Sequence, residues 1–446
     1  MKNFCFIFVI LAFSLSVNAL YAESEKENIS KIKTLIIPNV NIVKKDSPYI
    51  YISLLIKTGA ANESGAYAGI SGMITSLLLN ETQNKSKDQI EEIFYNIGGG
   101  MSVISHFDYS EIKLITTKAA FPEAMRILGE CLSEPKFSSE AITKAKEDSF
   151  LELVADYDNP FQKAYDRLRY VLYDTNPYKR SVYGFANSIR NSGAKEISAF
   201  FNENFNPQQI AITIVGNISE SDVSSAISKS FFWKKDIPKR RSIYEYEEKI
   251  DKSRSETIFN DIEDDSLTYY MIGWLAPNMK SPDYYKVLLL KTIIGTGKSS
   301  KMFKVLRQEN GIGYNMGCNY PDLKRQSHIY IYASAKDNGM EKLELTKKLI
   351  QEIIKDIKNG NVTEAELARA KNYLISQYEQ RNENLMNLAS DISVWDSEVS
   401  FEAFFDFEKN INSINLIDIK EVANKYLNNY AELICLPTRL SLDPKY

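Results

Sequence analysis

The chain contains 446 residues, of which 44% are hydrophobic and 25% are charged, with a net charge of −4 and a sequence pI of ≈ 5.6. This length is too great for one ordinary domain, and the composition is that of a globular protein. The acidic balance argues against a nucleic-acid-binding protein, which would normally carry a basic stripe.

The first residues have the features of a secretory signal peptide. Lys2 supplies a positive charge, Phe4–Val17 is almost wholly apolar, and the small residues Ala19 and Ala22 offer two cleavage positions. We therefore expect residues 1–22 to be removed and the protein to be periplasmic or secreted. A retained membrane anchor is the alternative, but the apolar run is short for a bilayer, and no later segment is long enough for a stable membrane span.

Strand-like and helix-like apolar patterns alternate along the first half. Strands are predicted at Lys33–Val43, Tyr49–Lys57, Met101–Phe107, Glu111–Thr117 and Gln209–Val215. Helices are predicted at Ala66–Leu79, Lys87–Ile97, Ala120–Cys131, Ser139–Tyr157, Pro160–Tyr173 and Ala194–Phe205. This order indicates an α+β lobe, in which helices pack on one face of a largely antiparallel sheet.

The composition changes between residues 220 and 255, where Lys, Arg, Glu and Tyr dominate and apolar periodicity fades. We interpret this range as a linker. Beyond it, strands are predicted at Thr268–Trp274, Tyr314–Tyr320, His328–Ala333 and Ala431–Leu436. Helices are predicted at Tyr284–Ile294, Ser299–Gln308, Met340–Lys358 and Ile417–Tyr426.

The second half therefore repeats the order of the first. The local match is clearest where Ile142–Lys146 aligns with Leu367–Lys371, because both segments open long helices. An internal duplication of about 200 residues explains this pattern, and chance similarity between two α+β halves is the alternative. We expect two homologous lobes, residues 31–219 and residues 256–446.

The segment Gly69–Leu79 has the apolar i, i+3, i+4, i+7, i+8 pattern of a half-buried helix. With this glycine-led helix after the first hairpin of a duplicated α+β chain, the sequence resembles the insulinase/pitrilysin family of zinc peptidases. The resemblance implies a helix with the motif H-x-x-E-H, in which two histidines bind zinc and the glutamate activates water. Here the three motif positions are Gly72, Thr75 and Ser76, and none can serve in those roles.

The resemblance also implies a third zinc ligand, a glutamate on a helix that ends at Asp158-Asn159-Pro160. Glu152 lies within one residue of this position, and Leu151 is the alternative occupant. One carboxylate does not make a zinc site, for which three protein ligands are usual. The only histidines, His106 and His328, lack partners at ligand spacing and are interpreted as strand residues with hydrogen-bonded nitrogens. We therefore expect this chain to bind no metal or other cofactor.

The predicted mature chain has three cysteines, Cys131, Cys318 and Cys435, without a C-x-x-C pair. We favour buried apolar thiols. One disulfide among the three is the alternative in an oxidising compartment.

The most specific match is Ser299–Tyr314, which resembles the second-half pattern of the family: a helix ending in an L-R-E/Q run, then glycine, then G-x-x-Y. The resemblance implies that Arg307 and Tyr314 reach across a cleft, grip the substrate main chain and steady the oxyanion. An arginine offers five donors and a permanent charge, and a tyrosine offers one rigid hydroxyl. Gly311 is expected to end the helix in a left-handed conformation. A helix-capping arginine and a half-buried strand tyrosine are the purely structural alternative.

A glycine-rich run, Gly98–Asp108, resembles the family's G-G-x-x-N-A-x-T segment, whose edge strand pairs with substrate. Ser102 replaces the asparagine and Val103 the alanine. Pairing with an edge strand needs only main-chain groups, so these replacements do not by themselves prevent it.

Active bacterial members of this family can be heterodimers, in which one subunit supplies zinc and the other the arginine–tyrosine pair. The resemblance therefore implies a non-catalytic, substrate-binding subunit that degrades peptides together with a zinc-bearing paralogue. Two other functions are weighed: a catalytically dead structural or chaperone-like scaffold in the bacterial envelope, and a hydrolase using His106, Asp108 and a serine. No nucleophile motif supports the hydrolase. The partner, the choice between homodimer and heterodimer, and the substrate stay open.

Overall fold

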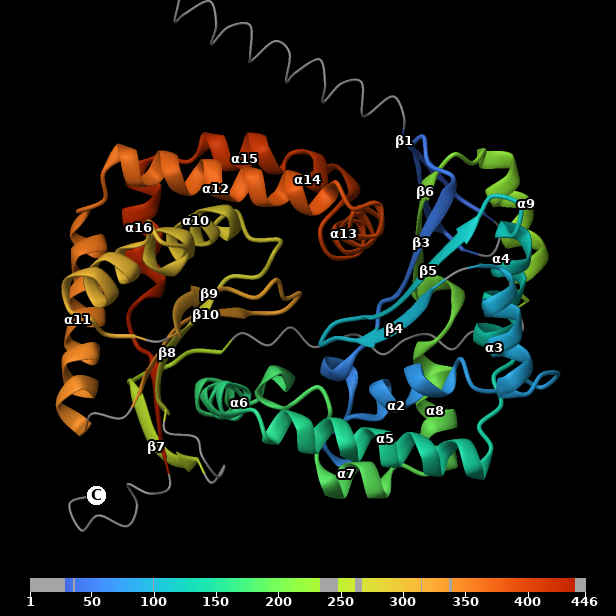
Figure 1. Cartoon of the computed structure of the whole chain (residues 1–446), viewed down its shortest axis with the longest axis horizontal. Helices are drawn as coiled ribbons and strands as arrows, with labels where there is room; N and C mark the ends of the chain where they lie inside the picture. Colours follow the sequence, from blue (N-terminus) through green and yellow to red (C-terminus); the bar gives the residue numbers. More distant parts are fainter. Residues whose placement is uncertain are drawn as a thin grey trace, which may run out of the picture.

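The computed structural model describes residues 29–34, 37–98, 100–232, 248–260, 267–313, 315–336 and 339–437. It consists of two lobes, each with one sheet and its own helices (Figure 1), which confirms the predicted α+β architecture. The predicted signal peptide, Gly99 and Tyr314 lie outside the described residues.

The first sheet has six strands in the order β1-β2-β6-β3-β5-β4. Their bounds are β1 Ile29–Ile32, β2 Asn39–Lys44, β3 Tyr49–Ile56, β4 Met101–Ser105, β5 Ser110–Thr117 and β6 Ile210–Gly216. Only β2 and β6 are parallel. The single strand predicted over Lys33–Val43 is wrong, because a turn in which Thr34 N donates to Ile37 O separates β1 from β2.

The second sheet has five strands in the order β7-β11-β8-β10-β9. Their bounds are β7 Arg254–Asn260, β8 Leu267–Ala276, β9 Asn315–Asn319, β10 Ser327–Lys336 and β11 Ala431–Pro437. Only β7 and β11 are parallel. Strand for strand, this order and these directions repeat β2-β6-β3-β5-β4 of the first sheet, which is the topology that an internal duplication leaves.

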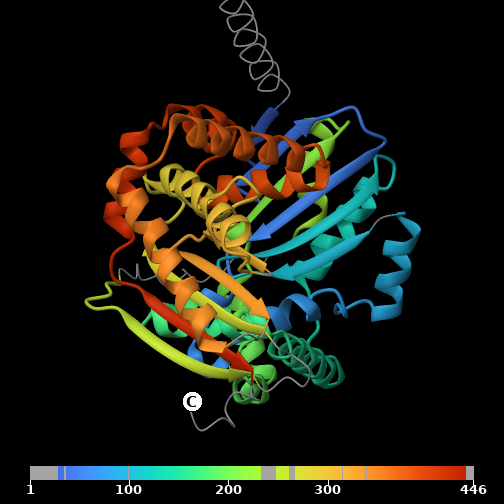
Figure 2. The ribbon, with the colours of Figure 1, turned by 60° about the vertical axis from the view of Figure 1, so that its left-hand side comes forward.

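The helices of the first half are α2 Ile70–Leu77, α3 Lys87–Asn96, α4 Phe121–Ser133, α5 Ser139–Tyr157, α6 Pro160–Leu172, α7 Ala186–Asn191, α8 Ala194–Asn204 and α9 Glu220–Ser230. Those of the second half are α10 Tyr284–Gly295, α11 Gly339–Asn359, α12 Glu364–Asn382, α13 Leu385–Glu398, α14 Phe401–Phe405, α15 Phe407–Ser413 and α16 Leu416–Tyr426. Figure 2 shows helices of the second half lying over one face of its sheet.

Side-chain caps reveal the same repeat in the helices. Ser138 and Asn159 cap α5 and α6, and Thr363 and Asn384 cap α12 and α13. The two caps are separated by the same length of chain in each half. Each cap accepts a hydrogen bond from a backbone amide of the first helical turn that would otherwise lack a partner.

One helix of each half covers the sheet of the other half. Helix α6 packs on β8 and β11, and α13 packs on β3 and β6 (Figure 1). Strands β6 and β11 are consequently buried along their whole length. Such strands read as continuous apolar runs because both of their faces are covered.

The two cross-lobe contacts differ in chemistry. Under α6 the contact is apolar, with Leu168 and Leu172 in one cluster with Met271 and Leu433. Under α13 the contact is mixed: Val43 and Val215 share a cluster with Ile392. Beside them, Ser393 Oγ donates to Thr213 Oγ1 at 2.7 Å, and Asn41 Nδ2 donates to Asp396 Oδ2 at 3.1 Å.

Both ends of the interval between the lobes are structured, and residues 233–247 lie outside the described residues. Helix α9 packs on α4, and β7 begins at Arg254, so both ends of the predicted linker 220–255 belong to the lobes. Helix α9 was not predicted from the sequence, because most of its surface is polar. Its short buried side includes Val223, Ala226 and Ile227.

Two predicted helices also differ from the structure. The predicted helix Ala66–Leu79 is shorter, because a separate turn at Gly65–Tyr67 precedes α2. The predicted helix Ser299–Gln308 is largely a π-helix, η5 Phe303–Glu309.

Cys131, Cys318 and Cys435 are buried and form no disulfide among the described residues, as favoured from the sequence. Among the described residues, no helix combines the length and apolar character needed to cross a membrane.

Candidate functional site

Helix α2 carries the three positions that align with the zinc motif. Its N-cap, Gly69, has a φ of 92°, a left-handed conformation that favours glycine. The cap itself comes from Glu63: Oε2 accepts from Gly69 N at 2.7 Å, and Oε1 accepts from Ser71 N at 2.8 Å and from the Ser71 hydroxyl. Burial raises the pKa of Glu63 to about 7, although the bonds from Ser71 and Gly69 oppose the shift.

None of the three motif positions offers a metal ligand. A Cβ built at Gly72 would meet nothing within 4 Å, so this position is an open space beside the helix. The hydroxyl of Thr75 donates to Gly72 O at 2.7 Å, and that of Ser76 donates to Met73 O at 2.9 Å. Zinc sites in proteins use imidazole, thiolate or carboxylate groups, and two hydroxyls bonded to their own helix do not replace them.

The possible third position lies on α5, which packs against α2. Burial and then the charge of Asp148 raise the pKa of Glu152. Leu151 is 67% exposed, which is unusual for a leucine. In the part of the chain that the structure describes, no group of three or more His, Cys, Asp or Glu residues could hold a metal ion. The donor set around α2 therefore does not fit zinc.

The second-half motif lies in the other lobe, on η5 and the turn that follows it. Arg307 is exposed, and its Nη1 donates to Gly313 O at 2.6 Å, which ties the end of η5 to the turn. Gly311 has a φ of 63°, as predicted from its place after the helix, and Gly313 has a φ of 91°. Side chains of π-helical turns are often found at functional sites. The guanidinium is thus held at Gly313, and residue 314 lies outside the described residues.

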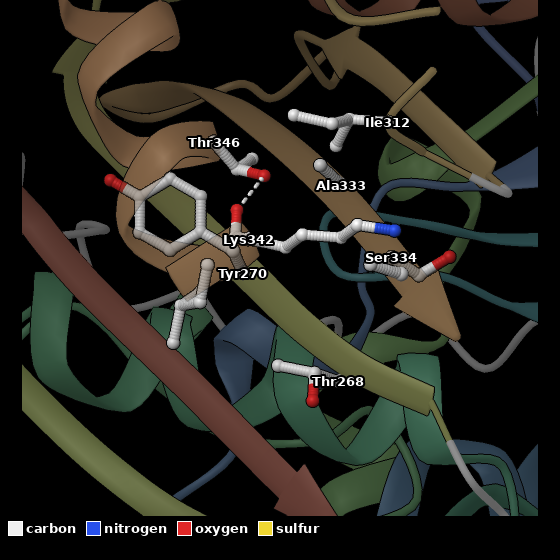
Figure 3. A pocket seen from close by; sticks show the side chains of 9 residues that line it. Thr268, Tyr270, Ile312, Ala333, Ser334, Lys342 and Thr346 are labelled. Atoms are coloured by element: carbon white, nitrogen blue, oxygen red, sulfur yellow. Dashed lines mark hydrogen bonds between the residues drawn. The ribbon is translucent and has the colours of Figure 1, made fainter. Parts of the chain in front are cut away.

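A small cavity adjoins this turn (Figure 3). Ile312 forms one side of it, and Thr268, Tyr270, Ser334 and Lys342 are among the residues that complete it. The cavity measures ≈ 20 Å³, about the room that one water molecule needs. Ile312 is only 2% exposed, because the turn packs against the residues of β8, β10 and α11 that line the cavity with it.

Strand β4, the predicted substrate-pairing strand, lies at the edge of the first sheet. It pairs only with β5 within that sheet, and Ser102 and Ile104 are exposed. Its free side therefore presents main-chain donors and acceptors to an incoming chain.

A buried polar cluster between the lobes was not predicted. Asp108 is 6% exposed and accepts from Tyr178 Oη at 2.6 Å and 2.7 Å and from Lys324 N at 3.0 Å. Burial, and then the charge of Glu398, raises the pKa of Asp108 to about 6. Lys324 Nζ in turn pairs with Glu398 at 2.9 Å. The only signal in the sequence was Asp108 itself, directly after the edge strand.

The two histidines do not form a catalytic group. In β10, the Nε2 and Nδ1 atoms of His328 each lie 2.9 Å from a tyrosine hydroxyl, of Tyr165 and Tyr173 respectively, as the interpretation of satisfied nitrogens requires. Burial and the charge of Arg169 lower its pKa to about 3. His106 follows β4 rather than lying in a strand, because the chain turns there. Asp108 binds Tyr178 and Lys324, so the arrangement gives no support to a hydrolase built on His106 and Asp108.

Two family models match the chain. The model described as "Insulinase (Peptidase family M16)" matches residues 40–185, and the model described as "Peptidase M16 inactive domain" matches residues 193–374. Together these matches run from β2 to α12.

Relatives and solved structures agree over nearly the same length. The zinc protease PqqE of Helicobacter pylori is 22% identical over 391 residues, 85% of each chain. An uncharacterized zinc protease of Rickettsia felis is 25% identical over 412 residues, 91% of this chain and 96% of the relative.

A crystal structure of a protease from Helicobacter pylori superposes with a TM-score of 0.84 at 21% identity, covering 92% of this chain and 99% of that one. A peptidase M16 inactive domain from Pseudomonas fluorescens gives a TM-score of 0.80 at 21% identity, covering 92% and 98%. At these identities the two structures establish the shared fold.

Proposed function

The chain belongs to peptidase family M16, the insulinase-type peptidases, and from this we propose that it is a non-catalytic, substrate-binding subunit of a heterodimeric zinc peptidase. The observation that carries the proposal is a contrast between the two lobes. Helix α2 offers a glycine and two self-bonded hydroxyls where zinc ligands would stand. The other lobe keeps Arg307, exposed and anchored to its turn.

In this proposal the metal belongs to a zinc-bearing paralogous subunit, and this chain contributes Arg307 and Tyr314 to the shared cleft. One Arg307 N–H is used on Gly313 O, and the described residues provide no partner for its other donors. A permanently charged fork held in this way suits a peptide carbonyl or an oxyanion. The free side of β4 would add main-chain pairing to an extended substrate.

We further propose that the protein acts after export, in the periplasm or outside the cell. The support is the apolar run Phe4–Val17, flanked by Lys2 and by small residues. Cys131, Cys318 and Cys435 are buried and form no disulfide among the described residues.

The test is to purify the chain alone and together with a zinc-bearing M16 paralogue of the same organism, and to measure peptide hydrolysis. We expect no hydrolysis by the chain alone and partner-dependent hydrolysis by the complex. Arg307→Ala should lower the kcat/KM of the complex by about 100-fold, the usual effect of removing one donor to an oxyanion. Lys304→Ala, an exposed cation on the same η5, is the matched control and should leave the rate unchanged.

Unchanged activity of the Arg307→Ala complex would show that the site is not shared. If the chain co-purifies with envelope proteins and stimulates no peptidase, the scaffold function takes the place of the proposed one. Elemental analysis of the isolated chain provides an independent check, since stoichiometric zinc would contradict the assignment of the metal to the partner.

A further inference from the structure

Helix α5 carries a row of exposed apolar side chains, which we call the α5 ridge. Leu151, Val154 and Tyr157 are 67%, 54% and 52% exposed. They follow one another at i, i+3 spacing, so each side chain lies beside the next along the helix surface. Single exposed apolar residues are common on soluble proteins, but a contiguous group marks a surface that another molecule covers.

The internal repeat provides a comparison for the α5 ridge. Helix α12 is the counterpart of α5, since matching Ser138 with Thr363 also matches the next caps, Asn159 with Asn384. The positions of α12 that correspond to the α5 ridge are all polar: Ser376, Glu379 and Asn382. The repeated fold therefore does not require apolar residues at these positions, and the α5 ridge is a property of the first lobe alone.

The α5 ridge lies beside the degenerate zinc motif. It begins at Leu151, one of the two residues that align with the third zinc ligand. Helix α5 packs on α2 (Figure 1), and α2 lies next to β4, where the Ser105 hydroxyl donates to the Ser71 hydroxyl at 3.3 Å. The outward positions of α2 hold only the small residues Gly72 and Ser76, and a Cβ at Gly72 would meet nothing within 4 Å. Side chains of α2 therefore do not obstruct the surface between β4 and the α5 ridge.

A peptide paired with the free side of β4 can reach the α5 ridge. A helix with its side chains is about 10 Å across, and an extended chain advances about 3.3 Å per residue. About three or four residues therefore carry a peptide from β4 across α2 to Leu151 and Val154. The main-chain groups of β4 and the apolar side chains of the α5 ridge thus form one continuous surface.

We infer that the α5 ridge binds an apolar segment of the peptide substrate, consisting of adjacent aliphatic or aromatic residues. The inference rests on the proposed function, which makes a peptide the ligand of this cleft, and it gives the lobe without zinc ligands a part in choosing the substrate. A peptide is favoured over the partner subunit as the occupant, because the α5 ridge continues a surface that already presents groups for main-chain pairing.

Fluorescence anisotropy of the isolated chain, residues 23–446, provides the test. The two labelled probe peptides are identical except for a central segment, which is Leu-Val-Phe in one and Ser-Thr-Asn in the other. We expect the apolar peptide to bind at least about tenfold more tightly, because burial of even one aliphatic side chain has an effect of this size. Neither zinc nor the paralogue takes part in this measurement. A complex without peptidase activity would therefore refute the proposed function, whereas equal peptide affinities would refute the inference alone.

Two variants locate the binding. The double variant Leu151→Gln, Val154→Gln should weaken binding of the apolar peptide about tenfold and leave that of the polar peptide unchanged. Ile417→Gln, at a site on α16 that is 69% exposed, is the matched control and should change neither affinity. Circular dichroism of each variant confirms the fold, which surface substitutions of this kind leave intact.

Three results overturn the inference: equal affinity for the two peptides, no binding of the apolar peptide at millimolar concentration, or unchanged affinity of the double variant. If the double variant keeps its peptide affinity but no longer forms a complex with the zinc-bearing paralogue, the α5 ridge belongs to the subunit interface instead.

Discussion

The buried cap of α2 predicts a specific dependence of stability on pH. Glu63 has an ordinary pKa of 4.5 that burial raises to about 7 in the folded chain. A carboxyl whose pKa is higher in the folded state stabilises the fold fully below its unfolded pKa, and this stability is lost as the pH rises through the folded pKa. The change from 4.5 to about 7 corresponds to about 3 kcal/mol of unfolding free energy, lost over that interval.

Glu63→Gln removes this titration and keeps the size of the side chain. The amide has one oxygen where the carboxyl has two, so one of the amides of Gly69 and Ser71 loses its acceptor. We expect the variant to be less stable than the wild type at pH 4.5, by about 1–3 kcal/mol. Its deficit should shrink as the pH rises and disappear or reverse near pH 7.5, because only the wild type loses the contribution of Glu63.

Urea unfolding followed by circular dichroism, at intervals between pH 4.5 and 7.5, measures both profiles. Taking the difference between variant and wild type cancels the titration of all other groups. Glu92→Gln, at an exposed site on α3, is the control and should give a constant difference. If the difference for Glu63→Gln is equally constant, the carboxyl does not change its charge over this interval, and the account of the cap is wrong.

Three further predictions concern α2 and the cluster around Asp108. Gly72→Ala should stabilise the chain by up to about 1 kcal/mol in urea unfolding, because its Cβ meets nothing within 4 Å. Gly69→Ala should destabilise it, because its Cβ would lie 2.5 Å from a carbonyl oxygen. The opposite order of stabilities would contradict the geometry of α2. The double variant Gly72→His, Ser76→His should bind one equivalent of zinc in calorimetry, with Glu152 as the third ligand. Adding Glu152→Gln should abolish this binding. Zinc binding that persists without the Glu152 carboxylate would assign the third ligand to another residue. Asp108→Asn should reduce the loss of unfolding free energy between about pH 4 and 6, because the raised pKa of Asp108 gives stability that is lost as the pH rises through about 6. An unchanged profile in the same unfolding assay would exclude this contribution.

Local patterns predicted most of the secondary structure. Helix α5 has the predicted bounds Ser139–Tyr157, and its cap, Ser138, is local in sequence. The replaced zinc positions were equally visible, since each is a single residue type at a known spacing.

Contacts between distant segments were not predictable in this way. Helix α13 presents Ser393 and Asp396 to Thr213 and Asn41 of the first sheet, and nothing local in the sequence pairs these residues, whose partners lie 180 and 355 positions away. The cluster around Asp108 was not predicted for the same reason: its partners Tyr178 and Lys324 come from distant parts of the chain.

The exchange of α6 and α13 between the lobes also bears on how the chain is made and how it arose. The first sheet stays uncovered on one face until residues 385–398 have left the ribosome, so the first half does not complete its structure alone. A chaperone that holds the chain unfolded until its last quarter is available would suit this order of events. The same exchange is what the fusion of a domain-swapped homodimer would leave behind, with two copies of one ancestral subunit now joined in a single chain.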